Sequence, residues 1–262
     1  MLKFSKANAK TEALKQVDEL KPYLSDKRKI YSLDLLSGHS CPFANECLSK
    51  AVVIDGKRKI KDGKNTKFRC FSASQEVQYT NVFNSRKHNF DSLRGLHVND
   101  MIALLSDSLP KNAGIIRIHV AGDFFNRDYM FAWYTVAMMN PHTLFYAYTK
   151  SIRYWLAINE FPILHNFVLT ASYGGTHDHM IDEFGLRSTK VVFSEAEAEE
   201  LGLEIDHDDS HAARPSLRDK DFALLIHGTQ PKGTLASEAL KALKGKGSYS
   251  RKKNLTNERS MV

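Results

Sequence analysis

Three cysteines, Cys41, Cys47 and Cys70, are the residues of this sequence best suited to chemistry. Cys41 and Cys47 share one short loop, Ser40-Cys41-Pro42-Phe43-Ala44-Asn45-Glu46-Cys47. Three thiols cannot complete a disulfide framework, but three thiolates suit a metal or iron–sulfur site with one open position. We therefore expect a metal site on these residues. The alternative is three buried cysteines that bind nothing.

Composition and charge indicate an ordinary water-soluble globular protein. Hydrophobic residues make up 42% of the 262 residues and charged residues 26%. No apolar run is long enough for a transmembrane helix, so we expect no membrane contact. The first six residues, Met1-Leu2-Lys3-Phe4-Ser5-Lys6, lack the apolar core of a signal peptide. We expect a cytoplasmic protein, whose reducing surroundings keep the thiols free.

The net charge of +7 is concentrated in two basic segments, residues 57–69 and 241–259. Such segments can meet a phosphate backbone, so a nucleic acid or nucleotide is a candidate partner. A solvated loop and a soluble tail are the alternative. The candidate nucleic-acid or phosphate contacts are Lys57, Arg58, Lys59, Lys150 and Arg153.

Strand and helix patterns alternate along the chain, which predicts an α/β fold with about six mostly parallel strands. A partial (β/α)6 barrel and an open doubly wound sheet both fit this alternation. We expect a helical segment over 1–29, one α/β domain over 30–230 with a basic insert at 51–69, and a basic tail over 231–262. The predicted strands are 30–35, 115–120, 143–149, 166–172, 190–193 and 222–226. The predicted helices are 7–24, 72–108 with a break near Gly95, 126–139, 151–158 and 195–201, and a hairpin is expected to turn at Asp55-Gly56.

Both architectures place ligands at the carboxyl ends of the parallel strands. Those ends are polar and rich in glycine, and the first of them leads into the cysteine loop. We expect a cofactor to bind there. The candidate cofactor-binding residues are Gly122, Asp123, Phe124, Tyr173, Gly174 and Gly175.

Four motifs resemble the phage family known as gene product 88. They are Leu36 to Cys47, Arg69-Cys70-Phe71-Ser72-Ala73, Arg117 to Phe125, and Phe145 to Ser151. The resemblance covers about residues 30–175 and implies a phage, prophage or plasmid protein that works in the host cytoplasm.

That family is in turn similar to radical S-adenosylmethionine enzymes, which build a partial barrel. The similarity implies a 4Fe–4S cluster on Cys41, Cys47 and Cys70, with S-adenosylmethionine at the open iron. Gly122-Asp123 lies where the motif that binds the cofactor's amino group would fall. The gaps between the cysteines, five and 22 residues, are longer than in those enzymes. The basic insert must therefore fold back to bring Cys70 to the site.

Two further classes of function stay open. One is a non-catalytic iron–sulfur protein that binds nucleic acid or a host protein. The other is a zinc- or iron-dependent hydrolase or nuclease, with ligands from the histidine groups 177–179 and 207–211 beside Asp123. His39 is a candidate fourth ligand if the cysteines bind zinc; the alternatives are a hydrogen bond to a cluster sulfide or a cap on the loop. His119 lies inside a predicted strand, and we interpret it as a core residue with satisfied hydrogen bonds.

Overall fold

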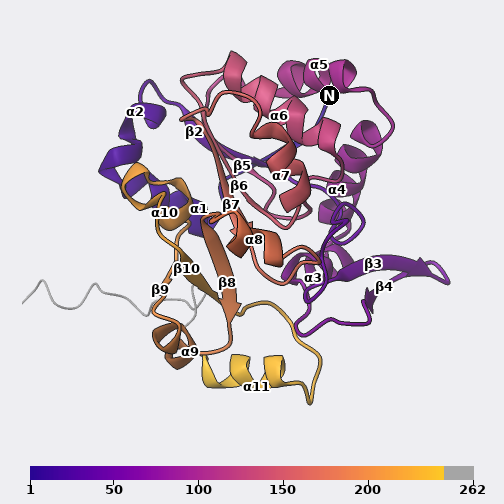
Figure 1. Cartoon of the computed structure of the whole chain (residues 1–262). Helices are drawn as coiled ribbons and strands as arrows, with labels where there is room; N and C mark the ends of the chain where they lie inside the picture. The colour runs from indigo at the N-terminus through magenta and orange to yellow at the C-terminus, as the bar shows by residue number, and fades with distance from the viewer. Residues whose placement is uncertain (245–262) are drawn as a thin grey trace, which may run out of the picture.

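The computed structural model describes residues 1–244 and is built around an eight-stranded sheet (Figure 1). The strand order is β1-β2-β5-β6-β7-β8-β10-β9, and every neighbouring pair is parallel except β1 and β2. This confirms the α/β class. The bounds are β1 (Phe4–Lys6), β2 (Lys29–Leu33), β5 (Ala113–Ile118), β6 (Leu144–Thr149), β7 (Phe167–Ser172), β8 (Ser188–Val192), β10 (Phe222–Leu225) and β9 (Glu204–Ile205).

The six central strands are those that the sequence predicts, with small shifts at their ends. From β2 to β10 they lie side by side in chain order, without the reversal that a doubly wound sheet has at its switch point. Within the described residues the sheet does not close, because β1 and β9 form its two edges. The strand ends that carry the candidate residues therefore meet along one edge of an open sheet.

The single helix predicted over residues 7–24 is wrong. Four short pieces replace it: α1 (Ala9–Glu12), the 3-10 turns η1 (Ala13–Gln16) and η2 (Asp18–Leu20), and α2 (Lys21–Leu24). Val17 is extended, with φ −87° and ψ 114°, and this breaks the helix between η1 and η2. Leu14 and Leu20 are nevertheless fully buried, so the short pieces still pack two leucines against the sheet.

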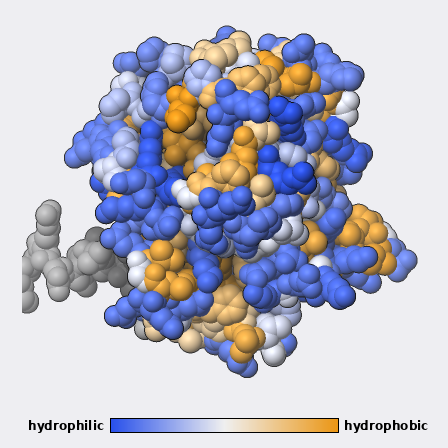
Figure 2. Space-filling view, viewed as in Figure 1, coloured by the Kyte–Doolittle hydropathy of each residue, from blue (hydrophilic) through white to orange (hydrophobic). Residues whose placement is uncertain are grey.

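A hairpin projects from the body of the molecule on the right of Figure 1 and Figure 2. It consists of β3 (Ser49–Ile54) and β4 (Lys57–Asp62), which pair antiparallel. The turn lies at Asp55 and Gly56, whose φ angles are +52° and +70°, as a tight two-residue hairpin turn requires. The predicted hairpin inside the basic insert is confirmed.

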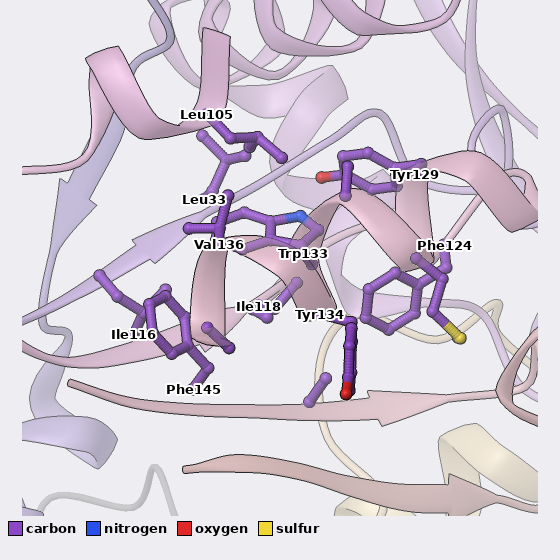
Figure 3. Packing of buried hydrophobic residues seen from close by; sticks show 14 of the residues in the cluster. Leu33, Leu105, Ile116, Ile118, Phe124, Tyr129, Trp133, Tyr134, Val136 and Phe145 are labelled. Carbon is purple, nitrogen blue, oxygen red and sulfur yellow. The ribbon is translucent and has the colours of Figure 1, made fainter. Parts of the chain in front are cut away.

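Two apolar cores cover the two faces of the sheet. The larger lies under α4 (Thr80–Leu93), α5 (Val98–Ser108), α6 (Arg127–Met139) and α7 (Ile152–Ile158). In it Trp133 and Tyr129 of α6 pack over Ile116 and Ile118 of β5 (Figure 3). The second core joins Leu14, Leu20 and Tyr146 to α10 (Ser210–Ala213) on the opposite face.

The remaining helices lie around the edge of the sheet. The stretch predicted as helical over 72–108 is three helices, because α3 (Phe71–Gln78) ends at Tyr79 and a second break near Gly95 separates α4 from α5. The others are α8 (His179–Glu183), α9 (Glu195–Glu200), the 3-10 turn η3 (Pro215–Leu217) and α11 (Leu235–Ala242). Of the basic segment 241–259, residues 245–259 lie outside the described part. Among the described helices none is long and apolar enough to cross a membrane.

Candidate functional site

The cysteine loop leaves β2 through a bend that only glycine allows. Gly38 has φ +68°, and a Cβ there would lie 2.5 Å from the carbonyl oxygen of Ser49. The Gly38 N–H donates to Cys41 Sγ at 3.3 Å. A main-chain donor aimed at a sulfur stabilises the thiolate form, which is the form that binds metal.

A buried ion pair anchors the start of this loop to α3 and α4. The main-chain N–H and the hydroxyl of Ser37 both donate to Glu76 Oε1, at 3.0 and 2.8 Å. Arg86 pairs with the same oxygen at 3.2 Å. Burial raises the pKa of Glu76 against the opposing effects of Arg86 and Ser37. The loop is thus held by a buried polar network rather than by apolar packing alone.

The basic insert folds back, as a site on Cys70 requires. After β4 the chain returns along the cysteine loop, where the N–H groups of Lys67 and Phe68 both donate to Glu46 O, at 2.7 and 3.2 Å. The N–H of Cys70 then donates to Ser49 Oγ at 3.3 Å. Cys70, which directly precedes α3, therefore lies beside the loop that carries Cys41 and Cys47.

All three cysteines line one cavity of about 190 Å³. Burial raises the pKa of Cys41, and Asp123 and the other two cysteines raise it further. Burial likewise raises the pKa of Cys47 to about 11, although Lys150 opposes the shift. No disulfide joins them. Within the described residues, no three Cys, His, Asp or Glu side chains gather around a single metal-ion position.

Asp123 lies in the same cavity and is held by three hydrogen bonds. Its Oδ1 accepts from Thr149 Oγ1 at 2.6 Å and from the Phe124 N–H at 2.7 Å, and its Oδ2 accepts from the Lys150 N–H at 2.8 Å. Burial raises its pKa in spite of these donors. Gly122 beside it has φ +94°, and a Cβ there would lie 2.6 Å from Ser40 Oγ. Both of these candidate cofactor contacts line the cavity.

Lys150 also lines the cavity, but its ammonium group is directed to the main chain. Its Nζ donates to Ser172 Oγ at 2.6 Å and to the carbonyl of Tyr173 at 2.7 Å. Arg153, the other cation predicted near this strand end, is exposed and does not line the cavity.

Four of the predicted cofactor contacts lie outside the cavity. Gly174 O accepts from the N–H groups of Asn45 and Glu46, and Gly175 forms a bridge with Ala44, so both glycines clasp the cysteine loop. The ring of Phe124 is fully buried in the larger core. The Tyr173 hydroxyl pairs with Asp182. None of these four residues lines the cavity.

The candidate zinc ligands are not brought to the cysteines. His39 is exposed, and its Nε2 lies 3.0 Å from the carbonyl oxygen of Ala51. His177 packs edge-on against Phe43, and His211 lies between Glu204 and Asp206. No histidine of the two groups lines the cavity, although Asp209 of the group 207–211 does.

The cavity is also lined by an ion-pair cluster of Lys10, Arg117 and Asp209, whose pairing the sequence analysis did not predict. Asp209 pairs with Lys10 at 2.9 Å and with Arg117 at 2.5 Å, and Tyr148 Oη lies 3.3 Å from its Oδ1. Burial opposes ionisation of Asp209, but the two cations lower its pKa to about 2. An arginine inside the apolar strand 115–120 is a signal that points to such a partner. Nothing in the sequence connects it to Lys10 or Asp209.

His119 differs from its interpretation as a satisfied core residue. It follows the end of β5 with φ +72°, a left-handed conformation that is rare for residues other than glycine. The residue lines the cavity, and its ring packs against Phe124 and Tyr129. Its Nε2 lies 3.0 Å from Tyr129 Oη. Nδ1 is buried without a hydrogen-bond partner among the described residues. Strained, incompletely paired residues are typical of functional sites.

Comparison with protein families gives the same family that the motifs around this cavity resemble. Residues 2–247 match the family described as gene product 88. The chain belongs to the gene product 88 family. The match extends on both sides of the motifs, which span about residues 30–175. No curated protein and no solved structure gives a significant match to this gene product 88 protein.

Proposed function

We propose that this gene product 88 protein holds one 4Fe–4S cluster on Cys41, Cys47 and Cys70 and binds S-adenosylmethionine beside it. The observation that carries the proposal is that all three thiols line one cavity together with Asp123. Each cysteine of such a cluster binds a different iron, so the sulfurs need not surround a single ion position. A non-catalytic cluster protein that binds nucleic acid or a host protein is the alternative.

Metal binding would change the protonation of the three thiols. Burial and mutual repulsion raise the pKa of Cys41 and Cys47, and positive metal charge would reverse that effect. The Gly38 N–H and the Lys150 ammonium supply further stabilisation of thiolates. Metal charge would therefore have to lower these raised pKa values, and the Gly38 N–H and Lys150 act in the same direction.

When bound, the reduced cluster would supply one electron to S-adenosylmethionine. The chain's own residues would bind and orient that cofactor. Asp123 keeps lone pairs on Oδ2 beyond its one bond to the Lys150 N–H, so it can accept a charge-assisted hydrogen bond from an ammonium group. Phe68, Phe71 and Ile226 give the cavity apolar walls that exclude water.

The strand order supports the partial-barrel form of this proposal. Six parallel strands follow one another in chain order, as in a (β/α) barrel that has been opened. The cavity lies where their carboxyl ends meet, which is where barrels bind ligands. We further propose that the protein acts in the cytoplasm of a phage host, where reducing conditions preserve the thiols.

The test is release of 5′-deoxyadenosine from S-adenosylmethionine by anaerobically reconstituted, reduced protein. We expect release by the wild type and none by the Cys41→Ala variant. A protein that carries iron and sulfide but neither binds nor cleaves S-adenosylmethionine would be a non-catalytic cluster protein. A colourless protein with stoichiometric zinc would support the hydrolase class instead.

A further inference from the structure

One face of the β3–β4 hairpin gathers four lysines. Directly opposite residues of an antiparallel pair share a face, and the register pairs Lys50 with Lys61, Val52 with Lys59 and Ile54 with Lys57. We call this surface the lysine face. Figure 2 shows apolar surface beside hydrophilic surface on the projecting hairpin.

The opposite face of the hairpin is braced against the body of the protein. Ser49 and Ala51 are buried there. Arg58 donates to Thr80 Oγ1 at 2.6 Å, and its guanidinium lies 5.3 Å from the centre of the Phe83 ring. The predicted contact set Lys57, Arg58 and Lys59 is therefore divided. The two lysines face solvent, while Arg58 fixes the hairpin to α4.

Within the described residues, no ion pair neutralises the charge of the lysine face. No acidic residue in the range 1–244 forms an ion pair with any of its four lysines, whereas Lys67 pairs with Glu46 and Lys87 with Asp91. Like charges directly opposite each other, as at Lys50 and Lys61, oppose strand pairing. This arrangement does not stabilise the fold, but it would stabilise a complex with a polyanionic ligand.

We propose that the lysine face binds the phosphate backbone of double-stranded DNA. A two-stranded ribbon fits the major groove of B-form DNA, whereas the major groove of A-form RNA is too narrow to admit side chains. Lysines on both strands can reach the phosphates that flank the groove. Val52 and Ile54 lie between those lysines, where they can meet thymine methyl groups.

This inference rests on the proposed function in one respect, because it names double-stranded DNA as the substrate class of the cysteine-lined cavity. The two ends of the hairpin lead directly into the cavity wall: β3 starts two residues after Cys47, and Phe68, Arg69 and Cys70 follow β4. DNA bound along the hairpin is therefore attached next to the cavity. Binding itself needs the lysines and not the cluster.

The test measures binding of a fluorescent DNA duplex of about 20 base pairs to the full chain at several salt concentrations. The hairpin variant is Lys57→Gln/Lys59→Gln/Lys61→Gln. The control is Lys3→Gln/Lys6→Gln/Lys111→Gln, which removes the same charge from exposed positions outside the hairpin. We expect the hairpin variant to lose at least about tenfold in affinity, with the slope of log K against log salt reduced by about 2 to 3. The control should stay within about twofold of the wild type.

Three results would overturn the inference. They are no duplex binding by the wild type, equal losses in both variants with unchanged thermal unfolding, and equal or tighter binding of double-stranded RNA or polyglutamate. The assay is run with and without reconstituted iron. DNA binding by a chain that takes up no cluster would remove the proposed function and leave this inference standing. A chain that takes up the cluster but does not bind DNA would overturn this inference and leave the proposed function standing.

Discussion

The N–H of Cys70 donates a hydrogen bond to Ser49 Oγ across the base of the β3–β4 hairpin, over 3.3 Å. Ser49 is fully buried and lies two residues after Cys47. This contact joins the second and third cysteines across 22 intervening residues. The sequence gap between Cys47 and Cys70 is longer than in compact cysteine motifs. The β3–β4 hairpin fills this gap, and its two ends lie side by side.

The Ser49→Ala variant should weaken that closure. The variant loses the acceptor of the Cys70 N–H and also the hydrogen bond between the Ser49 side chain and Asp62, which together cost about 1 to 3 kcal/mol of the free energy of unfolding. We expect this loss in urea unfolding, together with less iron retained after anaerobic reconstitution. Ser106→Ala is the matched control, because Ser106 Oγ is buried with no partner among the described residues. Equal stability and iron retention in both variants would contradict a role for Ser49 in placing Cys70.

Gly122→Ala should be costly for two separate reasons. The alanine must adopt φ +94°, and its Cβ would lie 2.7 Å from Leu35 Cβ and 2.6 Å from Ser40 Oγ. We expect destabilisation of about 2 to 4 kcal/mol, the sum of strain and overpacking. Gly185→Ala, at φ +55° with no atom within 4 Å, should cost only about 1 kcal/mol. Thermal unfolding of the two variants measures the difference, and equal losses would refute the close approach at Gly122.

Asp123→Asn should reduce cofactor binding as well as stability. In the wild type the Lys150 N–H and Thr149 Oγ1 both donate to the carboxylate. In either orientation, the asparagine amide would turn its NH₂ group toward one of these two donors. We expect a loss of about 1 to 3 kcal/mol in stability and at least about tenfold in affinity for S-adenosylmethionine. Thr149→Val removes one of the same hydrogen bonds but keeps the charge, so it should retain that affinity in isothermal titration. Equal affinity in Asp123→Asn and the wild type would show that the carboxylate does not hold the ammonium group.

His119 predicts a specific dependence of stability on pH. Burial and Arg117 lower its pKa from 6.5 to about 3. Between these values the unfolded chain binds the extra proton, so the free energy of unfolding falls as the pH is lowered from 6.5. The loss is up to about 1.4 kcal/mol per pH unit. His119→Gln should show a shallower fall between about pH 7 and 5.

Other groups do not obscure that comparison. Asp206 and Glu204 raise the pKa of His211, so its contribution is present below pH 6.5 and is lost as the pH rises through its folded pKa. It is common to both proteins and cancels in their difference. Asp209, with a pKa of about 2, stays ionised across the whole range. Parallel pH profiles of the two proteins would mean that His119 is not held neutral by burial.

The sequence predicted the central strands because β-branched and aromatic runs such as Ile115 to Ile118 report burial directly. It also predicted the turn at Asp55-Gly56, whose two residues favour positive φ. Asp123 directly follows the predicted strand 115–120 and lines the cavity with the cysteines. These are local signals, and they need no knowledge of the tertiary contacts.

The remaining features depend on contacts between distant segments. Gly174 and Gly175 were interpreted as cofactor contacts, but they clasp the loop around Ala44, a pairing that no local pattern encodes. Lys10 meets Asp209 across almost the whole described chain. The strand β1 has three residues, too few for a periodicity, and forms because β2 offers it a free edge.

The most direct test of the central claim is the iron and acid-labile sulfide content of anaerobically purified wild type beside Cys41→Ala, Cys47→Ala and Cys70→Ala. We predict about four irons and four sulfides per wild-type chain, with a broad absorption near about 400 nm, and loss of both in each variant. Iron content that is unchanged in Cys70→Ala, or a colourless wild type without iron, would contradict the account.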